Sequence, residues 1–139
     1  LGARLPALTQ LRLDCSNVAT LRDLGTGLSG LRVLYLARSN LRELEGFGSL
    51  TALMELYLAF NEVSDLSPLM CSERLQVLDL EANNVTSMDE VAWLQFLPSL
   101  QELTLRANPV ADDATAAPWL ALGQPQTQVP KAAAVTSTR

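Results

Sequence analysis

The sequence predicts an α/β repeat solenoid: a horseshoe of about five repeats with a parallel sheet on its concave face and short 3₁₀ or α turns on its convex side. The pattern LxxLxLxxN recurs five times, at successive offsets of 23, 22, 22 and 25 residues. Its three leucine positions, and a fourth apolar position two residues beyond its end, hold only Leu or Val. The repeats begin at Leu8, Leu31, Leu53, Leu75 and Leu100.

Each repeat predicts one short strand, centred on its xLxLx segment. A single repeat cannot bury its own leucines, so the repeats must stack, with their strands pairing in parallel about 4.8 Å apart. The ninth position of each repeat carries a small polar side chain that can bond backbone groups where the strand turns outward. We expect this structural role for Ser16, Ser39, Asn61, Asn83 and Asn108.

The segments that return from one strand to the next carry helix-start signals and are short. In residues 64–69, Ser67 is expected as N-cap with Pro68 at the first helical position. In the longest return, Ser87 and Glu90 have capping-box spacing, and apolar residues recur at helical intervals up to Leu97. We expect one or two α-helical turns there, with a structural role.

Two domain segments are predicted. Residues 1–122 form the repeat domain, with Trp119, Leu120 and Leu122 covering its last repeat, and residues 123–139 form a polar, flexible tail. An uncapped end would instead favour self-association or folding of the tail onto the domain. Because the chain starts at Leu1 without a methionine, we expect a fragment whose native ends and neighbouring domains are missing.

Composition narrows the function classes. With 48% hydrophobic and 18% charged residues, the chain suits one soluble domain, and no apolar run approaches the 20 or so residues of a membrane span. Net charge is −5 with dispersed basic residues, which argues against nucleic acid as a partner. The two cysteines, Cys15 and Cys71, lie in distant repeats, so we expect no disulfide and a cytoplasmic location.

The sequence gives little support to catalysis or cofactor binding. It contains no histidine, which removes the commonest general base and zinc ligand, and leaves a Cys15 nucleophile without a partner to activate it. Gly25, Gly27 and Gly30 lack the Lys and Ser or Thr of a phosphate-binding loop. Neither acidic pair, at residues 89–90 or 112–113, supplies the oxygen ligands of a calcium site. We expect no catalytic residues, cofactor, metal or small-molecule substrate.

The concave face is the candidate binding surface. Strand alternation sends the third, fifth and seventh positions of each repeat away from the core, and places both tyrosines of the chain on adjacent strands. The residues expected to bind a protein partner are Arg12, Val33, Tyr35, Arg38, Glu55, Tyr57, Phe60, Asp79, Glu81, Glu102 and Arg106.

Two interpretations of the tyrosine pair remain open. Aromatic residues on neighbouring strands can pack merely to shield the sheet. Tyr and Arg are also enriched at binding hot spots, and a small apolar centre with a charged rim is typical of an interface core, which favours a binding role. Because Glu55, Asp79, Glu81 and Glu102 make one flank acidic, we expect a partner that presents Lys or Arg there.

The short repeat, with Leu-Ser-Pro-Leu after the third strand, resembles the leucine-rich repeat subfamily with 22-residue units, typified by a nuclear regulatory subunit of protein phosphatase 1. Bacterial internalins use a similar unit outside cells. The resemblance covers residues 5 to 110. Within the family, the chain is most similar to a ciliary member. It is carried by residues 21–26, 36–38, 55–58, 64–69, 77–81 and 103–105.

The resemblance implies a noncatalytic scaffold for protein binding in the cytoplasm and in the cilium or flagellum. Its role would be an adaptor in outer dynein arm assembly, maturation or intraflagellar transport, with outer dynein arm subunits or ciliary transport factors as partners. The alternative is a regulatory scaffold for a phosphatase catalytic subunit. One departure concerns the end of the array, where the family's closing segment with Tyr-Arg and a Leu-Pro-x-Leu-x-x-Leu-Asp-like pattern is missing after Val110.

Overall fold

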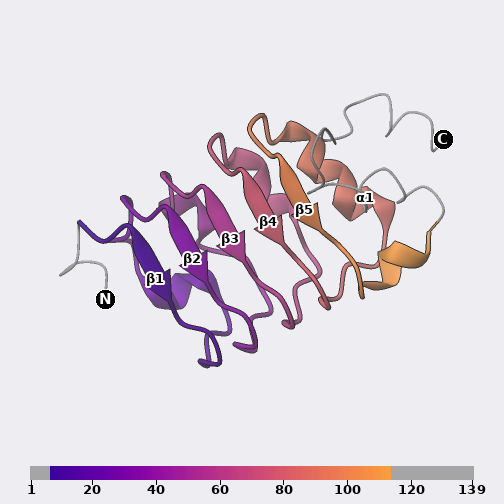
Figure 1. Cartoon of the computed structure of the whole chain (residues 1–139), viewed down its shortest axis with the longest axis horizontal. Coiled ribbons are helices and arrows are strands. Elements are labelled where there is room, and N and C mark those ends of the chain that lie inside the picture. The colour runs from indigo at the N-terminus through magenta and orange to yellow at the C-terminus, as the bar shows by residue number, and fades with distance from the viewer. Residues whose placement is uncertain (1–6, 114–139) are drawn as a thin grey trace.

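Five parallel strands of three residues each form one open sheet in chain order in the computed structural model, which describes residues 7–113 (Figure 1). Equivalent positions of successive repeats pair directly, so Leu11, Leu34, Leu56, Leu78 and Leu103 form one column across the sheet. The predicted repeat solenoid and its register are therefore confirmed. The strands are β1 (Gln10–Arg12), β2 (Val33–Tyr35), β3 (Glu55–Tyr57), β4 (Val77–Asp79) and β5 (Glu102–Thr104).

Short helices make up the other layer, behind the strands in Figure 1. The longest return contains the one α-helical turn of the described residues, followed by a 3₁₀ helix, as its spacing of apolar residues predicts. None of the helices in residues 7–113 has the length and apolar character that a membrane crossing requires. The helices are η2 (Leu21–Leu24), η3 (Phe47–Ser49), η4 (Ser67–Cys71), α1 (Met88–Val91), η5 (Ala92–Phe96) and η6 (Pro109–Asp112).

The core lies between the two layers and is built from the repeated leucines. All the Leu and Val of the pattern from Leu31 to Val110 are buried, most of them fully. The first repeat differs, since Leu8, Leu11 and Leu13 are only partly buried. This repeat contains β1, an edge strand of the sheet.

Buried polar side chains at the ninth position join each repeat to the preceding one. The Oδ1 of Asn61 accepts bonds from the backbone N–H groups of Ser39 and Leu41, both at 2.9 Å. Its Nδ2 donates to the carbonyls of Leu36 and Leu58 at 2.8 and 2.9 Å. Asn83 and Asn108 make equivalent contacts. The predicted structural role is thus confirmed for these residues.

The residue before each of these polar positions adopts a left-handed conformation. Positive φ angles of 54° to 63° occur at the eighth position of all five repeats, none of which has glycine there. The left-handed residue lies three residues beyond the end of each strand and directly precedes the ninth position. The five residues are Cys15, Arg38, Phe60, Ala82 and Ala107.

Two predicted helix caps need correction. Leu66 and not Ser67 occupies the N-cap of η4, and the Ser67 N–H donates to Asp65 Oδ1 at 2.9 Å. Ser87 is the N-cap of α1 as predicted, but its side chain makes no capping bond. The Glu90 carboxylate accepts instead from the Leu66 N–H at 2.8 Å, in the preceding repeat. A contact between repeats thus replaces the local capping box.

Two further predictions concern the cysteines and the end of the chain. Cys15 and Cys71 are both free and exposed, which confirms that they form no disulfide with each other. The predicted cap and tail, from Trp119 to Arg139, lie outside the described residues, as does the boundary at residue 122.

Candidate functional site

The exposed side of the β1–β5 sheet, called the sheet face below, carries the third, fifth and seventh positions of the repeats. Alternation along each strand turns these side chains away from the leucines. The strand register then sets their neighbours, so that Arg12, Tyr35, Tyr57 and Asp79 follow one another at the same level on β1 to β4. The structure therefore brings the predicted aromatic and charged residues together.

An aromatic and cationic row crosses three strands of this face. The rings of Tyr35 and Tyr57 stack with centroids 4.8 Å apart and planes 6° from parallel. The Arg12 guanidinium lies over the Tyr35 ring, 3.9 Å from its centroid. Both tyrosines are half-buried, so the row remains open to solvent on its outer side. Stacking of this kind contributes about 0.5–1.5 kcal/mol per pair beyond burial.

The Tyr57 hydroxyl is fixed by a neighbour on its own strand. It donates to Glu55 Oε1 at 2.6 Å. Burial of the ring, followed by this hydrogen bond and the charge of Glu55, raises the pKa of Tyr57 well above its usual value of 10. The phenol thus donates its proton to a hydrogen bond that holds Glu55 beside the row.

A second cation–aromatic pair lies where the strands end. The Arg38 guanidinium stands 4.1 Å from the centroid of the Phe60 ring, and both residues have the left-handed backbone described above. Phe60 is 42% exposed, an unusual exposure for a phenylalanine. The pair extends the aromatic surface from the centre of the sheet face to its rim.

Ion pairs neutralise both ends of the sheet face. Arg12 pairs with Asp14 at 2.9 Å and Arg106 with Glu81 at 3.1 Å. Asp14 also accepts from the Ala37 N–H at 2.8 Å, which holds it in place. Exposed pairs of this type contribute at most about 1 kcal/mol. They leave the carboxylates of Glu55, Asp79 and Glu102 in no ion pair within residues 7–113.

One residue of the predicted surface offers little to a partner. Val33 is only 8% exposed, because this short side chain lies among the longer Gln10, Tyr35 and Glu55 on the same face. Val77, two strands further along, is half-buried and presents the apolar contact instead. The position in the repeat does not by itself show which of the two valines is exposed. The size of the neighbouring side chains does.

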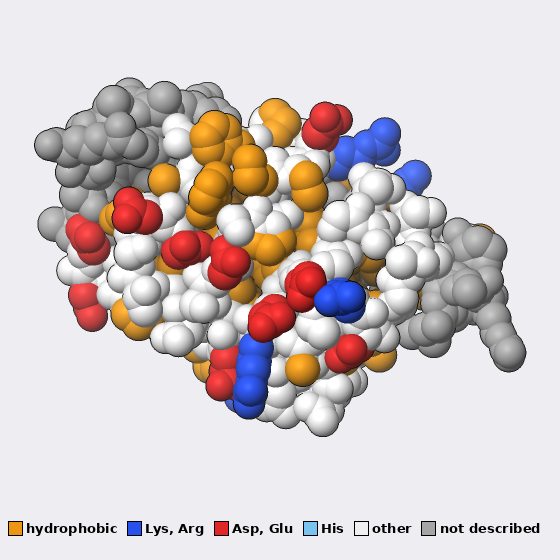
Figure 2. All heavy atoms as spheres, turned by 180° about the vertical axis from the view of Figure 1, so that it is seen from behind, with side chains coloured by type: hydrophobic (Ala, Val, Ile, Leu, Met, Phe, Trp, Pro, Cys, Tyr) orange, Lys and Arg blue, Asp and Glu red, His pale blue; other side chains and the backbone are white. Residues whose placement is uncertain are grey.

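The opposite face, formed by the return segments and called the return face, has its own hydrophobic surface. Figure 2 shows hydrophobic side chains gathered on one part of it. Met70 on η4 and Phe96 on η5 are 47% and 54% exposed, and the Trp93 ring lies 6.3 Å from that of Phe96. These residues are absent from the predicted site. The sequence does contain a signal for them: each is a large hydrophobic residue next to a core leucine, at a helix position that does not face the core.

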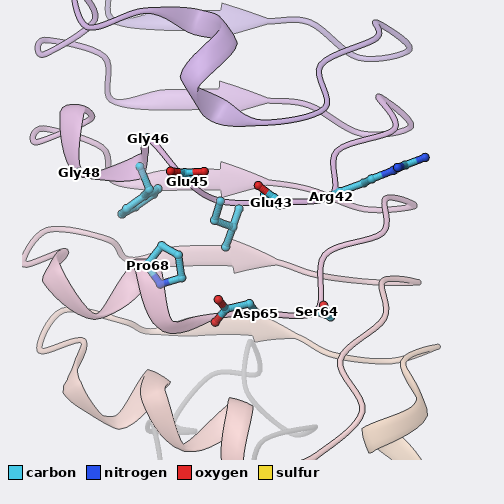
Figure 3. Close-up of a pocket in the computed structure, with 10 residues that line it drawn as sticks. Arg42, Glu43, Glu45, Gly46, Gly48, Ser64, Asp65 and Pro68 are labelled. Carbon is cyan, nitrogen blue, oxygen red and sulfur yellow. The ribbon is translucent and has the colours of Figure 1, made fainter.

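The return face also contains an open groove of about 640 Å³ between neighbouring turns (Figure 3). Gly46 and Pro68 belong to its two sides. Its charged residues are largely engaged, since Glu45 pairs with Arg22 and Asp65 accepts from the Ser67 N–H. Within the described residues, no group of three His, Cys, Asp or Glu could hold a metal ion.

Comparison with known sequences identifies relatives. A leucine-rich repeat family model matches residues 6–63 and 51–110. The chain is 52% identical over 109 residues to leucine-rich repeat-containing protein 56 of Rattus norvegicus, covering 78% of this chain and 20% of the relative. It is 36% identical over 118 residues to the homolog in Trypanosoma brucei brucei, covering 83% of this chain and 16% of that protein. The chain thus spans a fifth or less of these relatives.

Solved structures show the same fold. An internalin from Listeria monocytogenes matches with a TM-score of 0.68 and 26% identity, covering 86% of this chain and 34% of that one. A chain of the Drosophila melanogaster SNF/U2A' complex matches with a TM-score of 0.67 and 21% identity, covering 91% of this chain and 78% of that one. The repeats, the sheet and these matches agree: the chain belongs to the leucine-rich repeat family.

Proposed function

We propose that this chain is a noncatalytic module that binds a protein partner on its sheet face. The observation that carries the proposal is the row formed by Arg12, Tyr35 and Tyr57. Tyr and Arg are enriched where partners bind most strongly, and an aromatic centre with a charged rim is typical of an interface core. Leucine-rich repeat solenoids present such extended faces to other proteins.

The partly open state of the row supports binding over simple shielding of the sheet. Tyr35, Tyr57 and Phe60 all retain solvent exposure, although the core beneath them is already filled by buried leucines. The contacts of the row are also present before any partner arrives, because Arg12 pairs with Asp14 and Tyr57 donates to Glu55. A surface ordered in advance loses less side-chain entropy on association.

The finer role that we propose is that of an adaptor in outer dynein arm assembly, maturation or intraflagellar transport in cilia or flagella. Its partners would be outer dynein arm subunits or ciliary transport factors, in the cytoplasm and the cilium. The family resemblance implies this role, and the 52% identity to leucine-rich repeat-containing protein 56 supports it. The matching segment is a fifth of that relative.

Affinity capture tests this proposal. The 139-residue chain is immobilised and incubated with cytoplasm of ciliated cells, beside a Tyr35→Ala/Tyr57→Ala variant and a matched return-face variant, Met70→Ala/Phe96→Ala. We expect the unaltered chain and the return-face variant to capture outer dynein arm subunits or transport factors, identified by mass spectrometry. The tyrosine variant should not capture them. Capture of phosphatase subunits instead would overturn the ciliary role. Equal capture by the tyrosine variant would overturn the binding surface.

A further inference from the structure

Val77 lies among Glu55, Asp79 and Glu102, the sheet-face carboxylates that form no ion pair within residues 7–113. On β3 its register partner is Glu55, and on β5 it is Glu102. Asp79 follows two residues later on the same face of β4, at the level of Tyr57. The strand spacing places these carboxylates within about 10 Å of one another, close to the screening length of about 8 Å at physiological ionic strength.

The arginines that the structure describes on this face do not supply the missing positive charge. Arg106 on the neighbouring repeat is engaged with Glu81, and Arg12 with Asp14. The bonds made by two of the carboxylates are neutral, since Glu55 accepts from the Tyr57 hydroxyl and Asp79 from the Glu81 N–H. Like charges held together in this way favour the approach of a cation.

The row of stacked groups shows which cation fits. One side of the Tyr57 ring is covered by Tyr35, whose other side carries the Arg12 guanidinium. Toward β4 the register neighbour of Tyr57 is the short Asp79, and no aromatic or guanidinium group of residues 7–113 lies on the ring there. A planar guanidinium can occupy that side, stack on the ring and pair with Asp79. Arg12 makes the same two kinds of contact, with Tyr35 and Asp14.

We infer that the sheet face receives an arginine of a basic protein segment, which stacks on Tyr57 and pairs with Asp79. Its aliphatic part packs on Val77, and Glu55 and Glu102 complete the charge match. The inference rests on the proposed function and adds the chemistry of the partner to it. Charge favours protein over nucleic acid, because phosphates would be repelled by the same carboxylates.

Selection from a random peptide library displayed on phage tests the inference with the complete 139-residue chain. Peptides are enriched on the unaltered chain, and their affinity is measured by fluorescence anisotropy. Each enriched arginine is then replaced by citrulline, which keeps the planar shape and removes the charge. The sheet-face variant is Glu55→Gln/Asp79→Asn/Glu102→Gln. The matched control, Asp23→Asn/Glu43→Gln/Glu73→Gln, makes the same change in net charge at exposed carboxylates outside the sheet face.

We expect enriched peptides that carry arginine beside an apolar residue. Citrulline or the sheet-face variant should weaken binding about tenfold, more at low salt than at high salt, whereas the control variant should change it less than about twofold. Enrichment of uncharged or acidic peptides, or equal weakening by both triple variants, would overturn the inference. When the inference is overturned, the binding of the enriched peptides to a Tyr35→Ala/Tyr57→Ala variant decides the proposed function. Loss of binding would leave the sheet face as the binding surface, and unchanged binding would overturn the proposed function as well.

Discussion

Tyr35 and Tyr57 stack at 4.8 Å, the distance that separates neighbouring strands of a sheet. The stack follows directly from the register, because the two residues are paired across β2 and β3 and their side chains leave the sheet in parallel. Side chains at equivalent positions of adjacent repeats therefore form a ladder, in which neighbouring side chains contact one another across several strands.

Leu56→Ala and Leu78→Ala should each lower the free energy of unfolding by about 2–5 kcal/mol, because each leaves a cavity in a filled core. Both leucines are fully buried. Denaturant unfolding measures the loss. Met70→Ala removes a large side chain that is 47% exposed and should cost under about 1 kcal/mol. Equal losses in all three variants would contradict the register of the repeats.

Asn61→Ala should destabilise the protein by about 2–4 kcal/mol, because buried backbone groups of two repeats lose their hydrogen-bond partner. The Asn61 side chain serves the N–H groups of Ser39 and Leu41 and the carbonyls of Leu36 and Leu58. The matched control is Asn84→Ala, at an exposed asparagine, with an expected change below about 0.5 kcal/mol. Thermal unfolding compares them, and similar melting temperatures would argue against the bonded column.

Gly46→Ala should cost about 1–3 kcal/mol through backbone strain and a collision. Gly46 has a φ of 96°, and an added Cβ would lie 2.7 Å from the backbone nitrogen of Arg22. Gly48, two residues away, has nothing within 4 Å of such a Cβ. Gly48→Ala should therefore leave the unfolding free energy within about 1 kcal/mol of the original. A harmless Gly46→Ala would refute the close approach of the two turns.

Tyr57 should titrate above its usual value, since burial and Glu55 raise its pKa. The chain has two tyrosines, so a Tyr35→Phe variant reports Tyr57 alone by phenolate absorbance. We expect its midpoint well above pH 10, and a lower midpoint when Glu55→Gln is added. A midpoint at the ordinary tyrosine value would exclude the hydrogen-bonded arrangement.

The same shift has a consequence for stability. Below about pH 10, Tyr57 is protonated in both the folded and unfolded chains, and its contribution to stability is complete. Above that pH the unfolded chain releases the proton first, so the free energy of unfolding should fall as pH rises toward the folded pKa. Tyr57→Phe should show a smaller alkaline decline. Parallel thermal unfolding curves for the two proteins across this range would contradict the linkage.

The sequence predicts the repeats well because their leucines obey one strict spacing and because stacking alone can bury them. The same spacing locates the tyrosine row, since strand register carries position five of one repeat to position five of the next. It does not reveal the left-handed residues, because none is glycine and Phe60 is an uncommon choice for that conformation. Tertiary partners also override local patterns: Glu90 bonds Leu66 of the previous repeat instead of capping its own helix.

Side-chain footprinting of the chain bound to its captured partner tests the central claim most directly. Hydroxyl radicals oxidise exposed aromatic and sulfur-containing side chains, and both faces carry such residues. We predict that the partner protects Tyr35, Tyr57 and Phe60 on the sheet face and leaves Met70 and Phe96 on the return face as reactive as in the free chain. Protection of Met70 and Phe96 with unchanged tyrosines would contradict the account and assign binding to the return face.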